Sequence, residues 1–427
     1  MTTHTASALS HMRVLDLSRV LAGPWATQLL GDLGAEIIKI ERPGSGDDTR
    51  AWGPPWVKDE AGEPTDVAAY YLCTNRNKRS VTIDFTQPEG QALVRELAMK
   101  CDVLVENFKV GGLAQYGLDY ATLSALNPRL IYCSITGFGQ DGPYAERAGY
   151  DFLIQGMGGL MSLTGQPDGP PTKVGVALTD VLTGLYASNA ILAALAWRER
   201  SGRGQHIDLA LLDVQVACLA NQAMNYLASG RAPQRMGNAH PNIVPYDAFP
   251  TADGHMILAI GNDGQFARFC KEAGTEWAQD ERFANNAARV KHRDTLIPAI
   301  HAVTRTRSTA DWVAALESAA VPCGPINDIS QVFDDPQVQH RGLRIDLPHP
   351  AAGEVPLVAN PIRLSETPAT YRDAPPGLGA DTRAVLAEML GKQPTELDLL
   401  ASKGTIEPSL RWSSSDRSAC AQHAEDG

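Results

Sequence analysis

The sequence has little that supports a metal centre or a framework of disulfides. Its seven cysteines are scattered over 427 residues and never form a CxxC pair. Its ten histidines form neither an HxxxH nor an HExxH motif. Isolated cysteines are typical of buried thiols in a reducing compartment. We therefore predict a cytoplasmic protein whose chemistry uses no metal.

Positive charge, leader segments and long apolar runs are also scarce. The chain has 37 Lys and Arg residues against 49 Asp and Glu residues, which gives a net charge of -12. Such a surface repels nucleic acids and anionic lipids, so we expect neither as a partner. The start, MTTHTASALSHM, lacks the charged-then-apolar order of a signal peptide. The most apolar stretch, 182–197, contains Ser188 and Asn189 and is predicted to fall short of a membrane span.

The first third of the chain alternates between two apolar patterns. Short continuous apolar runs predict strands at 12–17, 35–41, 80–85, 102–108 and 129–135. Helical patterns lie between them, at 23–34, 86–101 (with Thr86 as N-cap) and 120–126. Strands that alternate with helices at this spacing indicate an α/β fold in which crossover helices cover a parallel sheet.

The rest of the chain predicts a second, smaller domain. Two long helices are expected at about 180–200 and 211–229, with a short strand between them. A mixture of strands and helices follows, including a helix after the capping residue Ser308. We predict a flexible N-terminus (1–11), a large domain (12–230), an inserted small α+β domain (231–335), a return segment completing the large domain (336–410) and a disordered tail (411–427).

The stretch GFGQDG (137–142) is a literal GxGxxG motif that follows a predicted strand. A dinucleotide site needs a helix directly afterwards and an acidic residue about 20 positions further on. Here Pro143 and Tyr144 follow, and the next acids, Glu146 and Asp151, come too early. We therefore predict no nucleotide cofactor, and a turn that brings backbone close to another ligand.

Basic residues gather at two places in this acidic chain. NRNKRS contains Arg76, Lys78 and Arg79, which form either a solvated loop or a binding site for phosphate or carboxylate groups. Lys39 and Arg42 come at the end of the second predicted strand. Ligands of open α/β sheets bind at the carboxyl ends of strands, so these two side chains are also candidates.

A single acid, Asp180, lies in the small-residue run VGVALTDVLTG at the start of a predicted helix. One interpretation is an N-cap, which accepts backbone hydrogen bonds. The other is a nucleophile, because a helix N-terminus would keep the carboxylate ionised and able to attack an activated acyl group. Both can hold together. Gly175, Ala177 and Gly184 would leave room for a substrate and expose N–H groups to a developing oxyanion.

Longer blocks of the sequence resemble the class III CoA-transferases, a group that also includes the α-methylacyl-CoA racemases. They run in order from about residue 12 to 330, and include VLDLSRVLAGPWATQLLGDLGAEIIKIERPGSGDDTR, NRNKRSVTIDFTQPEG, DVLVENFKVGGLAQYGLDY, NPRLIYCSITGFGQDGPY, AGYDFLIQGMGGLMSLTG, SGRGQHIDLALLDV and VPCGPIND. The resemblance implies a Rossmann-like large domain with an inserted small domain, and two chains interlaced as a homodimer.

The resemblance also implies a reaction in which Asp180 is the nucleophile. Its carboxylate attacks the donor thioester to give a mixed anhydride and CoA thiolate, and the thiolate returns to form an aspartyl-CoA thioester. An acceptor carboxylate then completes the exchange. Coenzyme A, carried as acyl-CoA, is implied to contact Val20, Leu21, Ala22, Arg42, Ile83, Phe85, Thr86, Asn107, Phe108, Lys109, Gly137, Phe138 and Gly139.

Four departures from family patterns bear on the substrate. Tyr150 stands where racemases carry a histidine, and a phenol with a pKa of about 10 is a poor base at pH 7, which favours a transferase. Gln115 replaces an arginine of the formyl-CoA enzymes, so Lys109 or the 76–79 cluster is expected to hold the CoA phosphates. Leu21 replaces a glutamine of those enzymes, and Gly237 is alone where they carry a glycine run, which argues against oxalate.

The stretch RMGNAHPNIVPYDAFPTADG resembles the members that use succinyl-CoA and a dicarboxylate, such as glutarate. Arg19, Tyr150 and His240 are candidate contacts for the substrate, although His240 could equally be a loop histidine bonded to backbone. Malate, itaconate and sulfinate analogues remain alternative acceptors, because they share the length and charge of glutarate. A racemase and a non-catalytic CoA-binding protein remain alternative functions.

Overall fold

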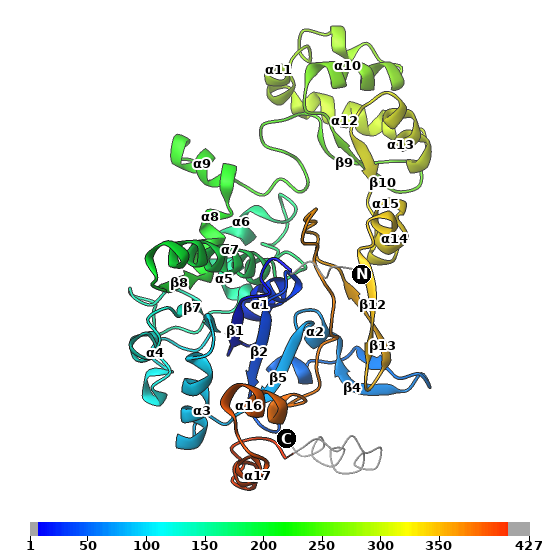
Figure 1. Ribbon diagram of the computed structural model, residues 1–427. Helices are drawn as coiled ribbons and strands as arrows, with labels where there is room; N and C mark the ends of the chain where they lie inside the picture. Colours follow the sequence, from blue (N-terminus) through cyan, green and yellow to red (C-terminus); the bar gives the residue numbers. More distant parts are fainter. Residues whose placement is uncertain (1–6, 409–427) are drawn as a thin grey trace, which may run out of the picture. The chain divides into compact units, whose positions relative to one another are not determined.

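The computed structural model describes residues 7–408, which divide into two units (Figure 1). The first unit takes the residues up to 154, 176–218 and those from 342 onward, and the second takes 155–175 and 219–341. The domain prediction placed this division differently, because it gave 155–175 and 219–230 to the large domain. The predicted tail at 411–427 lies outside the described residues.

Six parallel strands form the main sheet of the first unit, which confirms the predicted α/β fold. Their order is β5 (Lys78–Thr82), β2 (Glu36–Glu41), β1 (Arg13–Asp16), β6 (Val103–Glu106), β7 (Ile131–Thr136) and β8 (His206–Ala210). The crossover helices include α1 (Ala22–Asp32), α3 (Pro88–Ala98), α4 (Tyr120–Leu126) and α7 (Leu178–Ser201). This is the Rossmann strand order, which reverses between β1 and β6.

Both faces of the sheet are covered, which explains why apolar residues of its strands point to both sides. In β1, Val14 packs into the core on the side of α1 and α7, and Leu15 packs into the core on the side of α3. Ile37 and Ile38 of β2 divide in the same way. Thr86 is not the N-cap of α3: Gln87 holds that position, and the Thr86 hydroxyl instead donates to Asp84 (2.6 Å).

The C-terminal part of the first unit returns to this sheet. Helix α16 (Thr382–Leu390) adds Val385 and Leu386 to the core shared with α3, and α17 (Pro394–Ser402) adds Leu397. Two antiparallel hairpins were not predicted, because their strands are short and rich in proline and charge: β3 (Trp56–Lys58) with β4 (Pro64–Ala68), and β12 (Arg344–His349) with β13 (Gly353–Val358). One short helix, α2 (Ala69–Leu72), follows the first hairpin.

The second unit is built on a three-stranded antiparallel sheet in the order β11 (Cys323–Pro325), β10 (His255–Ala259) and β9 (Tyr246–Pro250). Its aromatic core contains Phe249, Phe266, Phe269 and Trp312. The helices around it are α10 (Asp263–Glu272), α11 (Asn286–Lys291), α12 (Arg293–Thr304) and α13 (Thr309–Ser318), with α6 (Leu160–Leu163), α9 (Ala220–Ser229), α14 (Ile329–Asp334) and α15 (Pro336–His340) elsewhere in the unit.

A local prediction differs from the structure. The helix expected over 211–229 is broken into α8 (Leu211–Ala217) and α9, because Ala220 adopts a φ of 46° that a continuous helix does not allow. The described part of the N-terminus, 7–11, forms a hydrogen-bonded turn, and the Leu9 side chain is buried. The flexibility predicted for 1–11 stays a prediction.

Helix α7 packs closely against α1. A Cβ atom placed on Gly184 would lie 2.7 Å from the Ala22 carbonyl oxygen, so this glycine permits helix contact and does not leave room for a substrate. By length and composition α7 is apolar enough to span a membrane, contrary to the sequence prediction. Since its buried face packs in the unit core, as core helices of soluble proteins do, this composition is no argument for a membrane segment.

We expect Gly184→Ala to lower the melting temperature, because the added methyl group would overlap the backbone of α1. The sign of this change is diagnostic. At a helical position with no close neighbour, alanine stabilises the fold by about 1 kcal/mol relative to glycine. Gly264→Ala in α10 is the control: its Cβ would meet only ordinary contacts at 3.4 Å or more, and the change should be neutral or stabilising. Thermal unfolding that gave both variants the same sign would contradict this packing.

Candidate active site

A cavity of about 750 Å³ opens within the first unit at the carboxyl ends of its parallel strands. Its walls follow β1, β2, β5, β6 and β7, around the point where the strand order reverses. Open α/β sheets bind their ligands at this position. The lining includes Asp180 and most residues expected at CoA: Val20, Leu21, Ala22, Arg42, Ile83, Phe85, Thr86, Asn107, Phe108, Lys109 and Gly137.

The GxGxxG turn follows β7 and has no helix directly behind it, as the sequence indicated. Gly137 lines the cavity, and a Cβ atom on it would lie 2.5 Å from the Cα atom of Gly149. Two backbone segments therefore touch here. Phe138 and Gly139 do not line the cavity: the Phe138 ring packs against Tyr144, and the Gly139 N–H donates to Thr136 (2.9 Å).

Asp180 is the third residue of α7, and the N-cap position belongs to Ala177. The N-cap prediction for Asp180 is therefore wrong. The acid that serves the first turn of α7 is Asp151, whose Oδ1 accepts the backbone N–H groups of Thr179 (2.8 Å) and Asp180 (3.4 Å). Asp151 begins helix α5 (Asp151–Met157), so the cap comes from another part of the chain.

Burial raises the pKa of Asp180 to about 7, and the nearby charge of Asp151 adds to this shift. The expectation that the helix N-terminus would keep Asp180 fully ionised is therefore corrected, because burial and a like charge outweigh the helix dipole. The Asp180 carboxyl group therefore exists in both the protonated and the ionised form near neutral pH. A carboxylate of this basicity is a stronger nucleophile than an ordinary aspartate, which makes the position suited to covalent catalysis.

Most of the predicted basic cluster is buried in ion pairs. Lys78 Nζ lies 3.0 Å from an oxygen of Asp16, and the Arg76 guanidinium lies 2.6 Å from Asp32. Lys39, also buried, pairs with Asp47 at 2.8 Å. Neither the solvated loop nor the phosphate site therefore describes Arg76 and Lys78.

The cations exposed at the cavity come from other positions. Arg42 and Lys109 are exposed and line it, together with Gln115. Arg79, at the edge of the predicted cluster, lies outside the cavity lining and pairs with Glu388 (2.8 Å). Of the two replacements that the sequence offered for the missing arginine, Lys109 lines the cavity and the 76–79 cluster does not.

The candidate substrate residues lie in both units. Tyr150 and Arg19 line the cavity of the first unit, where Arg19 pairs with Asp48 at 3.0 Å. His240 belongs to the second unit and lines a cavity of about 390 Å³ within it. Its Nδ1 atom accepts the backbone N–H of Asn242 (3.1 Å), which fits the alternative of a loop histidine bonded to backbone.

Sequence reasoning missed two acids of the first unit. In the sequence, Asp151 was noted only because it comes too early for a dinucleotide site. Its position directly after Gly149 and Tyr150 could have marked it as part of the active site. Glu106 ends β6 inside the core, where burial raises its pKa to about 7, and no local pattern marked it. Within residues 7–408, no three His, Cys, Asp or Glu side chains lie together in a way that could hold a metal ion.

Comparisons with known proteins agree with this geometry. The CoA-transferase family III model matches residues 9–382. The chain is 58% identical to the succinate–glutarate CoA-transferase of Agrobacterium fabrum, over 89% of this chain and 95% of that protein. It is 45% identical to the succinyl-CoA:glutarate CoA-transferase of Mus musculus, over 93% and 90% of the two chains.

Solved structures give the same result. A CAIB/BAIF family protein from Brucella suis superposes with a TM-score of 0.80 at 53% identity, and the alignment covers 90% of this chain and all of that one. A hypothetical protein from Mycobacterium tuberculosis superposes with a TM-score of 0.78 at 30% identity, over 90% and 99% of the two chains. Family match, relatives and fold together establish that this chain belongs to the class III CoA-transferases.

Proposed function

We propose that the enzyme transfers CoA from succinyl-CoA to glutarate. The observation that carries this proposal is Asp180, a carboxyl group with a pKa raised to about 7 at the edge of a cavity large enough for a cofactor-sized ligand. The relatives from Agrobacterium fabrum and Mus musculus, whose names specify succinate or succinyl-CoA and glutarate, support the choice of substrates.

In the proposed mechanism the ionised Asp180 attacks the thioester carbonyl of succinyl-CoA. The C–S bond breaks, leaving a succinyl–aspartyl anhydride and CoA thiolate. The thiolate attacks the aspartyl carbonyl, releasing succinate and forming an aspartyl-CoA thioester. Glutarate then repeats the two steps in reverse order, which releases glutaryl-CoA and restores the carboxylate. One thioester replaces another, so the exchange needs no external energy source.

The walls of the cavity support a division of roles. Arg42 and Lys109 provide positive charge for the phosphates of CoA, since they are the exposed cations among the predicted CoA contacts. Arg19 is the candidate partner for the distal carboxylate of the acid. Its guanidinium is about half exposed and already holds one carboxylate, that of Asp48.

Helix α7 supports a homodimer. Its buried face contains Ala187, Ile191 and Leu195, and its opposite face exposes Leu185, Tyr186, Leu192 and Trp197. A helix that is apolar on all sides is normally covered on all sides. A second copy of this chain is the proposed cover, as the family resemblance implies.

We expect the wild-type enzyme to form glutaryl-CoA from succinyl-CoA and glutarate, and Asp180→Asn to lower the rate at least a thousandfold. The isosteric amide retains the shape but cannot attack the thioester. After incubation with succinyl-CoA, the wild-type chain should carry an acyl or CoA adduct on Asp180, sensitive to hydroxylamine and visible by mass spectrometry. A panel with malate, itaconate and oxalate tests whether glutarate is the preferred acceptor.

The fold of Asp180→Asn provides the control. The folded-state pKa of Asp180, about 7, lies above the ordinary value of 3.8, so folding is progressively less favourable as pH rises between these values. Removing the ionisable group should therefore raise the melting temperature at pH 8 and change it little at pH 4. A variant that is more stable but inactive would have lost the nucleophile, and a variant that keeps full activity would refute the assignment.

The pH dependence provides a separate test. We expect kcat/KM for succinyl-CoA to rise with pH and level off above an apparent pKa of about 7, because only the ionised Asp180 attacks. Asp151→Asn keeps an oxygen to cap α7 but removes the neighbouring charge. The profile of this variant should move to lower pH by about one unit. A profile that did not move would show that Asp151 exerts no electrostatic effect on the nucleophile.

We expect a dimer by light scattering coupled to gel filtration, and Leu192→Glu should shift it toward the monomer. The introduced charge would be buried without a partner if a second copy covers α7. Arg203→Glu, at a residue exposed in the loop beyond the end of this helix, is the control and should remain dimeric. A Leu192→Glu variant with an unchanged mass would place the subunit contact elsewhere.

A further inference from the structure

The wall of the cavity after β1 contains an unusual backbone conformation. Val20 has a φ of 71°, in the left-handed region that residues branched at Cβ rarely adopt. Such a conformation costs on the order of 1–3 kcal/mol and persists only where surrounding contacts impose it. Val20 lines the cavity, and Leu21 and Ala22 beside it do the same. The shape of this wall therefore depends on whatever holds Val20.

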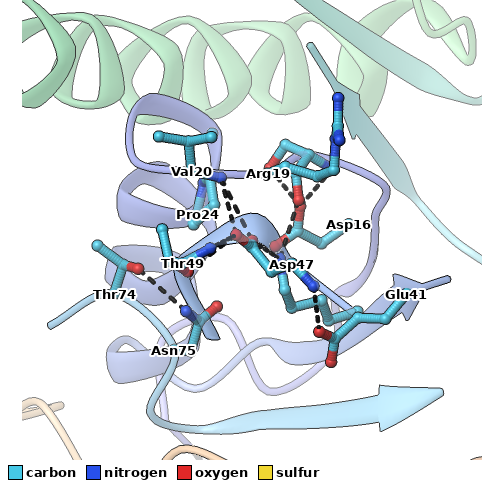
Figure 2. A network of polar contacts seen from close by, with 12 residues as sticks. Asp16, Arg19, Val20, Pro24, Glu41, Asp47, Thr49, Thr74 and Asn75 are labelled. Atoms are coloured by element: carbon cyan, nitrogen blue, oxygen red, sulfur yellow. Dashed lines mark hydrogen bonds and ion pairs between the residues drawn. The ribbon is translucent and has the colours of Figure 1, made fainter. Parts of the chain in front are cut away.

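The contact that holds Val20 comes from Asp47. Both oxygens of the Asp47 carboxylate accept the backbone N–H of Val20, at 3.2 and 3.3 Å (Figure 2). The same carboxylate accepts Lys39 Nζ (2.8 Å), and the N–H and hydroxyl of Thr49 (3.0 and 2.8 Å). Asp47 is buried, and these donors occupy its oxygens.

Lys39 binds the backbone of Ser18, the residue just before this wall. Its ammonium group donates to the carbonyl oxygen of Ser18 (2.9 Å) as well as to Asp47. On the other side, the Asn107 side chain accepts the N–H of Arg19 (2.9 Å) and donates to its carbonyl (2.8 Å). The segment 18–20 is thus held by the Lys39–Asp47 ion pair, in which Lys39 belongs to β2, and by the amide of Asn107, which follows β6.

We propose that Asp47, through its ion pair with Lys39, is a positioning residue that holds the 19–22 wall in the shape that binds acyl-CoA. The inference rests on the proposed acyl-CoA site. Asp47 borders the cavity, but its oxygens are taken by Lys39, Val20 and Thr49, so the role inferred for it is an indirect one. The strong ion pair and its hydrogen bonds hold the pKa of Asp47 down to about 2, so the carboxylate keeps its charge throughout the working range of the enzyme.

The test compares Asp47→Asn with a matched variant of another buried acid. Asparagine offers one acceptor oxygen, and its amide group must face either the Lys39 ammonium or the Val20 N–H. We expect the Kd for free CoA, measured by calorimetry, and the KM for succinyl-CoA to rise roughly tenfold, with kcat within about twofold of wild type.

Asp32→Asn is the matched control. Asp32 is equally buried and accepts hydrogen bonds from Arg76, Asn77 and Asn360, but it does not line the cavity. This variant should lose a similar amount of thermal stability and bind CoA as wild type does. If both variants weaken CoA binding equally, the effect of Asp47 is general destabilisation and the inference fails.

Glycine at position 20 provides a rescue, because glycine adopts a positive φ without strain. In the double variant Asp47→Asn with Val20→Gly, CoA affinity should recover to within about threefold of the Val20→Gly single variant. If Asp47 had only a general structural role, the losses of CoA affinity caused by Asp47→Asn and by Val20→Gly would add up in the double variant.

Thr49→Val covers the case in which Asp47→Asn does not fold. It removes one hydrogen bond to Asp47 and keeps the charge, and we expect a two- to threefold rise in the Kd for CoA. Unchanged CoA binding in Asp47→Asn, or in Thr49→Val if the first variant is unfolded, overturns the inference. Wild-type protein that fails to bind CoA would instead overturn the proposed site itself.

Discussion

Buried ion pairs at the carboxyl ends of the strands are the constraint on which this cavity depends. The register of β1 and β2 places Asp16 beside Lys39. Residues outside these two strands complete the ion pairs Asp16–Lys78, Lys39–Asp47 and Glu41–Arg50. Charges removed from water are costly unless every donor and acceptor is satisfied. Here the hydroxyl groups of Ser18, Thr27 and Thr49 and a backbone carbonyl complete the network.

This network also explains why the basic cluster in NRNKRS wrongly suggested an anion-binding site. In NRNKRS, three cations within four residues suggested a binding site for an anion. Their partners, Asp16 and Asp32, are more than 40 positions away along the chain, so no local pattern could show that Arg76 and Lys78 are neutralised. Arg42 and Lys109, the exposed cations among the expected CoA contacts, stand apart from this cluster in the sequence.

The fold was more predictable than the site. Apolar runs located the strands of the parallel sheet, because strands covered on both faces are rich in apolar residues on both sides. The short hairpins were missed because prolines and charges interrupt their pattern. The break at Ala220 was missed because a single residue with positive φ has no signature when it is not glycine.

For the site, the resemblance pointed to Asp180 but not to its environment. The ionisation of this carboxyl depends on its depth and on Asp151, which lies 29 positions earlier and reaches α7 only in the folded chain. A motif can thus point to a candidate nucleophile, whereas the acidity of that carboxyl group is a property of the tertiary structure. The same holds for Asp47, whose carboxylate acts on Val20 across 27 positions.

The contact between Gly137 and Gly149 restricts how the substrate range of such an enzyme can be altered. Because two main chains touch there, any side chain at either position would force the turn after β7 away from the loop that leads to Asp151. Engineering for new acids therefore has no freedom at these two glycines. Side chains that line the cavity, such as Leu21 and Tyr150, are free of this constraint.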